Sequence, residues 1–174
     1  MAQWVIDTAH SEIQFKVKHL MISTVSGLFG TFSGSAATES DDFDNAQVSF
    51  TAATASINTG NTDRDNHLRS ADFFDAAQYP EISFASSSMK KTNGNNFKLT
   101  GVLSMRGVSK EITLNAEFLG INKDPWGNTK AGFELTGRIN RKDFGLNWNA
   151  ALETGGVLVG EEVKIIANVQ LARQ

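Results

Sequence analysis

His19 is the polar residue whose place in the sequence is most informative chemically. It continues the alternating apolar positions Ile13, Phe15 and Val17, so its imidazole should point inward near the end of a strand. A buried imidazole needs a hydrogen-bond partner. Two partners fit this position: the head group of a ligand at a cavity mouth, or a neighbouring loop of the protein.

Arg64, Asp65 and His67 lie close together near the start of a predicted helix. The planar guanidinium of Arg64 suits a phosphate or a carboxylate, because it can donate two parallel hydrogen bonds. The alternative, which we favour, is that Arg64 and Asp65 pair within the protein and lock the helix across one end of the sheet. Arg141 and Asp143 present the same choice, since Asp143 precedes a Phe-Gly pair and can simply organise a turn.

The chain carries no recognisable catalytic or metal-binding motif, so we expect neither an enzyme nor a metal site. Zinc ligands converge on one point, whereas His10 and His19 are an odd number of residues apart and should face opposite sides of one extended strand. A G-x-S-x-G nucleophile elbow and a carboxylate pair at a recognisable spacing are missing. The Gly-rich stretch 154–160 lacks the lysine of a phosphate-binding loop and predicts a hairpin turn.

Length, charge and composition exclude several further classes. A chain of 174 residues fits one domain, taken as residues 1–174. The net charge is −3 and the lysines and arginines are scattered, which argues against a nucleic-acid partner. No apolar run approaches the roughly 18–20 residues that span a bilayer, so stable membrane insertion is not expected. The absence of cysteine removes disulfides, thiolate nucleophiles and iron–sulfur ligands.

The first residues, 1–7, bear on the compartment. They lack a basic segment followed by an apolar stretch and a small-residue cleavage site, which is the pattern of a secretory signal. We therefore expect a cytoplasmic protein. The periplasm is the alternative, if a signal peptide has been removed from the natural chain.

The elements that must position these residues are strands, because apolar and polar residues alternate along most of the chain. Clear alternation covers residues 11–20, 97–105, 112–118, 131–139 and 163–171, and weaker alternation covers 3–7, 23–37, 46–57 and 82–89. Tight turns are predicted at 92–95, 106–108 and 123–128, so neighbouring strands should run antiparallel as a meander. Residues 62–71 predict a short helix, since helix formers follow a plausible N-cap.

Eight or nine such strands can bury one apolar face as two packed sheets or as a closed barrel. The inward positions favour the barrel, because they combine many of the 12 phenylalanines with small residues. Gly27, Gly101 and Gly137 fall on these strand faces, where glycine marks a bend or the close approach of a ligand. An eight-stranded barrel either fills with its own side chains or holds one small ligand. Both remain open from the pattern alone.

Seven segments of the chain, in order, resemble the signatures of the YceI-like family of bacterial polyisoprenoid-binding, lipocalin-like proteins. No single motif is specific, but the ordered set covers nearly the whole chain. The segments are residues 4–19 (W-x-x-D-x-x-H-S-x-x-x-F-x-V-x-H), 25–29 (V-x-G-x-F), 56–59 (S-I-x-T), 64–75 (R-D-x-H-L-x-S-x-D-F-F-D), 79–84 (Y-P-x-I-x-F), 99–108 (L-T-G-x-L-x-M-R-G-V) and 139–145 (I-N-R-x-D-F-G).

This resemblance implies an all-β, extended eight-stranded antiparallel lipocalin-like β-barrel with a short helix at one end. Its long cavity would bind, carry or sequester an isoprenoid such as a polyprenyl chain, a quinone or a polyprenyl phosphate, often in a homodimer, with no cofactor beyond that lipid. Many relatives are exported behind a signal peptide, from which this sequence departs. The alternatives are a lipid-modifying enzyme with a His/Arg site at the cavity mouth, or a stress-response barrel that acts through its surface.

Twelve residues are predicted to contact the ligand. The expected cavity wall comprises Phe15, Val17, Phe29, Phe50, Phe84, Leu103, Phe118 and Phe133, and the further ligand-binding candidates are His19, Arg64, His67 and Phe144.

Overall fold

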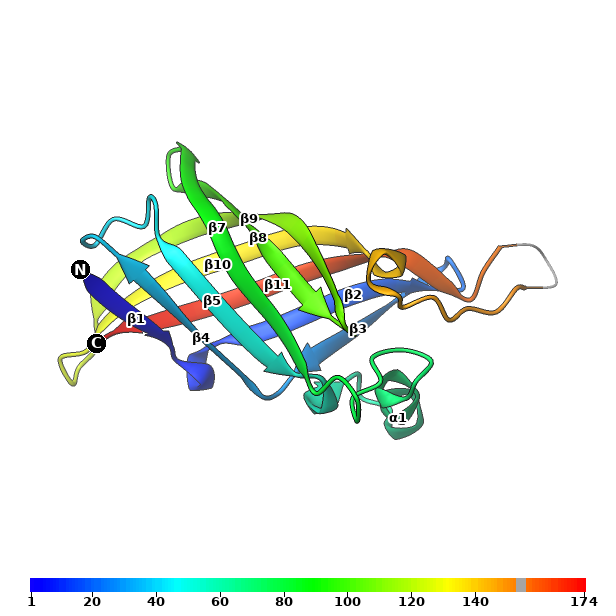
Figure 1. Ribbon diagram of the computed structural model, residues 1–174. Helices are drawn as coiled ribbons and strands as arrows, with labels where there is room; N and C mark the ends of the chain where they lie inside the picture. Colours follow the sequence, from blue (N-terminus) through cyan, green and yellow to red (C-terminus); the bar gives the residue numbers. More distant parts are fainter. Residues whose placement is uncertain (153–155) are drawn as a thin grey trace.

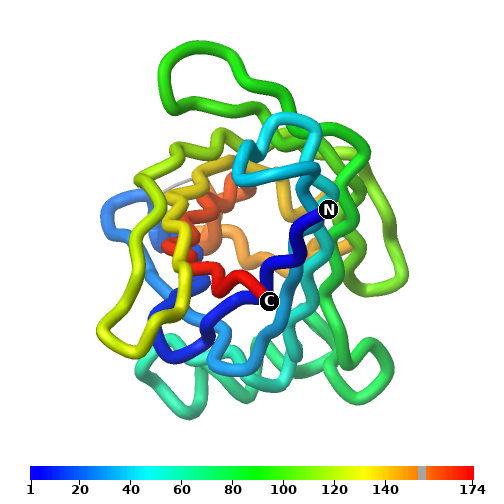
Figure 2. The backbone as a smooth tube through the Cα atoms, turned by 90° about the vertical axis from the view of Figure 1, so that its left-hand side faces the viewer, coloured from blue at the N-terminus to red at the C-terminus, as the bar shows by residue number. Residues whose placement is uncertain are grey.

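The computed structural model, which describes residues 1–152 and 156–174, is a closed antiparallel β-barrel with one short α-helix (Figure 1). The backbone forms a ring when viewed along the barrel axis (Figure 2). The strands are β1 (Ala2–Ile6), β2 (Glu12–His19), β3 (Ser23–Phe29), β4 (Phe32–Thr38), β5 (Gln47–Ala53), β6 (Ile57–Asn58), β7 (Glu81–Asn93), β8 (Asn96–Met105), β9 (Val108–Lys123), β10 (Thr129–Asn140) and β11 (Val159–Arg173), and the helix is α1 (Thr62–Arg69).

These eleven segments form the eight antiparallel strands of the barrel wall, which we call staves, in sequence order. This confirms the predicted barrel and its meander topology. Three staves are each interrupted once, between β1 and β2, between β3 and β4, and between β5 and β6. The predicted single strands 23–37 and 46–57 are therefore each divided in two. The ring closes because β11 pairs with β1 near its C-terminal end and with β2 along the rest of its length.

The three interruptions lie at one level of the wall: Val5 pairs with Ser35 and Gln14 pairs with Leu28, so the break between β1 and β2 lies opposite the break between β3 and β4. The amide of Gly30 donates to the carbonyl of Ser56 at 3.1 Å, and the amide of Ala53 donates to the carbonyl of Thr31 at 2.9 Å. These bonds join neighbouring staves where no regular ladder crosses. On the opposite side, β7 to β11 run through without a break of this kind.

The predicted turns are confirmed where the structure describes them. Gly94 joins β7 to β8 with φ of 51°, and Gly127 lies in the β9–β10 turn with φ of 85°. Positive φ favours glycine because it has no Cβ to clash with the backbone. The turn predicted at 154–160 lies partly outside the described residues.

The inward-facing glycines make room for the protein's own side chains. A Cβ at Gly27 would lie 2.3 Å from the ring of Phe15, and a Cβ at Gly137 would lie 2.3 Å from the side chain of Leu114. Gly101 is overlain in the same way by the ring of Phe84, at 2.6 Å. The group that approaches each of these glycines is thus a neighbouring residue of the wall, and not a ligand as the sequence suggested.

Helix α1 confirms the predicted short helix and ends at Arg69. The side chain of Asn61 caps its N-terminus by accepting a hydrogen bond from the amide of Arg64 at 3.0 Å. Buried Asp65 fixes the helix to the preceding chain, because its carboxylate accepts from the amide of Thr59 at 2.8 Å and from the Thr59 hydroxyl at 2.5 Å. The helix is thereby held at one end of the barrel (Figure 1).

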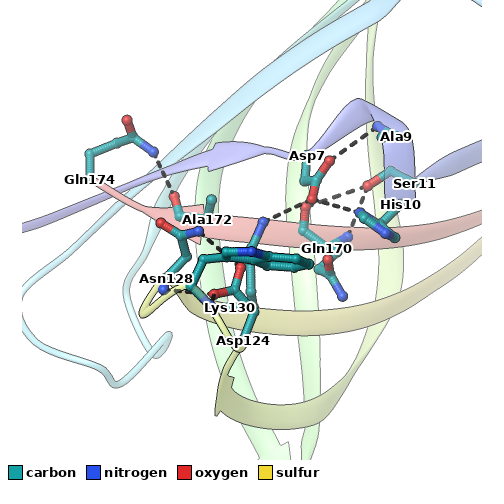
Figure 3. Close-up of polar contacts among 11 residues, drawn as sticks. Asp7, Ala9, His10, Ser11, Asp124, Asn128, Lys130, Gln170, Ala172 and Gln174 are labelled. Atoms are coloured by element: carbon teal, nitrogen blue, oxygen red, sulfur yellow. Dashed lines mark hydrogen bonds and ion pairs between the residues drawn. The ribbon is translucent and has the colours of Figure 1, made fainter.

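A polar cluster holds the break between β1 and β2 (Figure 3). The carboxylate of Asp7 contacts Nζ of Lys130 and Nδ1 of His10, both at 2.8 Å, while the Ser11 hydroxyl accepts from the amide of Gln170 at 2.9 Å. His10 lies in a 3₁₀ turn, Thr8–His10, so the prediction that it shares a strand with His19 is wrong. The turn forms because Asp7 caps it by accepting from the amide of Ala9.

The Asp7 cluster makes stability depend on pH. Hydrogen bonds from Lys130 and then from His10 lower the pKa of the Asp7 carboxyl to about 2, from an ordinary value of 3.8. A carboxyl whose pKa is depressed by folding stabilises the protein above its unfolded pKa, and this stabilisation is lost as the pH falls through the folded value. The affected window is thus between about pH 4 and pH 2.

We expect Asp7→Asn to lower the Tm by about 2–4 °C at pH 7, which corresponds to about 1 kcal/mol in a chain of this size. The difference from the wild type should shrink below pH 3, as measured by thermal unfolding followed by circular dichroism. Asp41→Asn is the matched control, because Asp41 forms an exposed ion pair with Arg173 at 2.9 Å and should change the Tm by less. Equal effects of the two substitutions would contradict this account.

Candidate ligand-binding cavity

The barrel encloses an apolar cavity of about 580 Å³. This volume lies within the range of small-molecule sites. The wall is apolar because each strand turns one face of its alternating pattern inward, as β11 does with Val163, Ile165, Ala167 and Val169. Ten of the twelve predicted ligand contacts line it: Phe15, Val17, His19, Phe29, Phe50, Arg64, His67, Phe84, Leu103 and Phe133.

Phe43 closes the end of the barrel near the termini. It lies between β4 and β5, and its ring centroid is 4.8 Å from that of Phe133, 5.2 Å from that of Trp4 and 5.7 Å from that of Phe118. Trp4 is itself fixed, because its indole N–H donates to the hydroxyl of Thr38 at 3.1 Å. We call Trp4, Phe43, Phe118 and Phe133 the aromatic plug.

Two predicted contacts, Phe118 and Phe144, are not part of the cavity lining. Phe118 has the inward parity expected of it, but Phe43 lies between it and the cavity. Phe144 is fully buried in the 3₁₀ turn Arg141–Phe144, where it belongs to the hydrophobic core. Asp143 lies in this turn and pairs with Lys110 at 2.7 Å, but the side chain that caps the turn is that of Asn140, which accepts from the amide of Lys142 at 3.0 Å.

The opposite end of the barrel, which we call the mouth, is the end where α1 lies (Figure 1). Here the cavity reaches the exposed side chains of Asp63 and Arg64 on α1. Leu158, at the start of the chain leading into β11, and Trp148 also line it. The mouth therefore has apolar walls and, on helix α1, two charged residues that border the cavity, Asp63 and Arg64.

His19 is half-buried at the mouth and borders the cavity. Its backbone pairs with Ser23 and Val159. Among the described residues, its imidazole has no hydrogen-bond partner, so the neighbouring-loop alternative finds no support there. The ring nitrogens are available to a group inside the cavity.

Arg64 and Asp65 are linked through Thr59 and do not pair directly. The guanidinium of Arg64 donates from Nε to the Thr59 hydroxyl at 2.7 Å and from Nη2 to the Thr59 carbonyl at 2.8 Å. Asp65 accepts from the same residue. The prediction that these two residues fix the helix is therefore correct, but the predicted direct pair between Arg64 and Asp65 is wrong. Arg64 remains exposed at the mouth with its position fixed.

His67 is held in place by aromatic and acidic neighbours. Its Nε2 lies 2.9 Å from a carboxylate oxygen of Asp72, and its ring packs edge-on against Trp148 at 4.7 Å and against Phe73 at 5.1 Å. No pattern in the sequence indicates Trp148, because this residue lies in an irregular segment without alternation. These three rings form one side of the mouth.

Arg141 organises the chain that borders the mouth. The residue is 3% exposed, and its guanidinium donates to the carbonyls of Leu146, Trp148, Val159 and Gly160 at 2.5–3.2 Å. Burial lowers the pKa of the Arg141 guanidinium from its ordinary value. Because its hydrogen bonds go to the protein backbone, Arg141 acts as a structural residue in this arrangement.

Neither a metal site nor a membrane-spanning helix is evident in residues 1–152 and 156–174. No three histidine or acidic side chains in these ranges gather as metal ligands. No helix there is long and apolar enough to cross a bilayer.

Comparisons with known proteins agree in pointing to one family. The model of the YceI-like domain matches residues 4–171. UPF0312 protein SAS2572 of Staphylococcus aureus (strain MSSA476) is 39% identical over 173 residues, which are 99% of this chain and 98% of that protein. The crystal structure of the Campylobacter jejuni YCEI protein is 35% identical with a TM-score of 0.78, covering 97% of this chain and 96% of the other.

A more distant solved structure shares the fold. It is a polyisoprenoid binding domain from Saccharophagus degradans implicated in plant cell wall breakdown. Its TM-score is 0.72 at 16% identity, and the match covers 98% of both chains.

We expect Phe43→Ala to lower the free energy of unfolding by about 3–5 kcal/mol, because it leaves a void at the centre of the aromatic plug. Urea denaturation measures this change. Trp126→Ala is the control: Trp126 is 83% exposed in the β9–β10 turn and its loss should change stability by less than about 0.5 kcal/mol. Similar midpoints for the two variants would mean that Phe43 is not a packed closure.

Proposed function

This chain belongs to the YceI-like domain family, and we propose that it binds one long-chain isoprenoid lipid in its barrel as a carrier or buffer. The observation that carries the proposal is the hollow interior, an apolar cavity of about 580 Å³ in a closed wall. The polyisoprenoid binding domain from Saccharophagus degradans, which has this fold, supports the choice of ligand.

Hydrophobic burial supplies more than enough free energy for such a ligand. Each five-carbon unit contributes about 4 kcal/mol, at about 0.8 kcal/mol per methylene-sized group. Eight units would give about 30 kcal/mol, beyond the ceiling of about 18–21 kcal/mol for noncovalent binding. Ordering of the flexible chain and partial exposure must absorb the difference, so affinity should level off as the chain lengthens.

The asymmetry of the cavity favours one orientation of the lipid. The hydrocarbon tail meets the aromatic plug, of which Phe43 and Phe133 line the cavity with apolar rings. The head group then lies at the mouth with the guanidinium of Arg64 and the imidazole of His19, which has no hydrogen-bond partner among residues 1–152 and 156–174. Both a quinone and a prenyl phosphate carry acceptors for these donors.

We propose that the lipid is held and not converted. Catalysis by His19 would require a nucleophile or a residue that orients the imidazole, and within the described residues its ring bonds to neither. The arginine buried beside the cavity, Arg141, is engaged with backbone carbonyls. Turnover of a bound prenyl phosphate that is lost in His19→Ala would favour the enzyme alternative.

Native mass spectrometry of gently purified protein tests the proposal directly. We expect a lipid adduct in the wild type, and we expect Ala167→Phe to abolish it or to restrict it to shorter chains, because Ala167 lies midway along β11 and lines the cavity. Asn168→Phe adds the same ring at the next, exposed position and should retain the wild-type adduct. Full-length lipid on folded Ala167→Phe would refute the proposal.

The role of His19 is tested with two ligands that differ only in the head group. We expect His19→Ala to weaken binding of a polyprenol by about 2- to 10-fold, the loss of one hydrogen bond, while binding of the corresponding hydrocarbon is unchanged. Competition against a fluorescent lipid gives both affinities. Equal losses for the two ligands would show that His19 acts through packing and not through its ring nitrogens.

A further inference from the structure

The turn between β2 and β3 presents three consecutive apolar residues to solvent. Leu20, Met21 and Ile22 are 36%, 58% and 84% exposed. Runs of exposed apolar residues are unusual in a soluble domain unless they serve a contact. We call these three residues the apolar tip. It lies at the same end of the barrel as α1 (Figure 1).

The backbone of the apolar tip does not favour these residue types. Leu20 has φ of 55° and Met21 has φ of 59°, a left-handed conformation that glycine or asparagine adopts more easily than a bulky residue. The turn therefore keeps large apolar side chains where its own geometry favours small ones. An interaction of these side chains with a group outside the turn accounts for their presence at positions with positive φ.

The apolar tip is continuous with the mouth of the cavity. The amide of Leu20 donates to the carbonyl of Leu158 at 2.8 Å, and His19 pairs with Val159. Leu158, Val159 and His19 all border the cavity. A lipid that leaves or enters the mouth therefore passes beside the tip.

The hairpin that carries the tip is positively charged, although the whole chain has a net charge of −3. No acidic residue occurs between Glu12 and Glu39, a stretch that contains Lys16, Lys18 and His19. On the outer face, Lys16 lies directly opposite Lys164 of β11, and the two carboxylates nearby on β11, Glu161 and Glu162, are already paired with Lys142 and Arg138. Like charges placed opposite each other repel, so this part of the wall is suited to a surface that carries negative charge.

We propose that the apolar tip and these lysines dock the mouth onto the surface of a bilayer that contains anionic lipids, where the cavity exchanges its ligand. This inference deepens the proposed function and depends on it for the meaning of the exchange. Peripheral binding of this kind combines insertion of a few apolar side chains with attraction of basic residues to anionic head groups.

Co-sedimentation of the purified protein with vesicles tests the docking. One vesicle is pure phosphatidylcholine and the other contains 30 mol% phosphatidylglycerol, roughly the anionic fraction for which surface attraction is appreciable. The test variant is Met21→Ser/Ile22→Ser. The matched control is Leu119→Ser/Trp126→Ser, which removes side chains of similar exposure, 61% and 83%, from the opposite end of the barrel.

We expect the wild type and the control to bind the anionic vesicles equally. Met21→Ser/Ile22→Ser should bind them about tenfold more weakly, from the lost burial of two apolar side chains. Lys16→Gln/Lys18→Gln should lose about fivefold per lysine at low salt, and only on anionic vesicles. Circular dichroism should show the same fold in all variants.

Three results would overturn the docking proposal. The wild type could fail to bind anionic vesicles, or the tip variant could bind them as well as the control does. The tip variant could also convert a wild-type dimer to a monomer in analytical ultracentrifugation, which would make the tip a self-association surface. Ala167→Phe separates the two proposals, because it should lose its lipid adduct and still bind vesicles as the wild type does.

Discussion

The structure depends on the closure of one sheet through backbone hydrogen bonds, made when β11 pairs with β1 and β2. A sandwich keeps its layers together by filling the space between them, because the inner side chains are its only connection. In a barrel, hydrogen bonds between neighbouring strands connect the whole wall, so side chains need not fill the interior to hold the fold together. The hollow of about 580 Å³ is a consequence of this closure.

The two ends of the barrel are held by different interactions. At the termini, aromatic rings centred on Phe43 supply the packed core that a domain of this size needs. At the mouth, side chains are held by hydrogen bonds to backbone atoms, as in Arg141 with its four carbonyls and Arg64 with Thr59. Packing stabilises the closed end, and polar contacts position the residues of the open end. Access of a ligand through the mouth therefore does not require a loss of packing at the closed end.

The sequence predicts those parts of the fold that repeat with a period. Alternation identified the strands and inward residues such as Phe15 and Phe84, because one face of each strand meets the interior. It could not identify Phe43 or Trp148, which lie in irregular segments whose side-chain directions depend on tertiary contacts. Phe118 shows a related limit. Its inward parity is predicted correctly, but Phe43, a loop residue distant in sequence, separates it from the cavity.

Three neighbouring staves are interrupted at one level, at residues 7–11, at Gly30 and Thr31, and near Ser56, and this divides that side of the wall into two short panels. Because ladder hydrogen bonds do not run through this boundary, we expect the two panels to move relative to each other more easily than the continuous strands opposite, β7 to β11. We therefore expect the circumference of the barrel to change more readily than its length, so that ligands of different thickness fit more easily than ligands of different length.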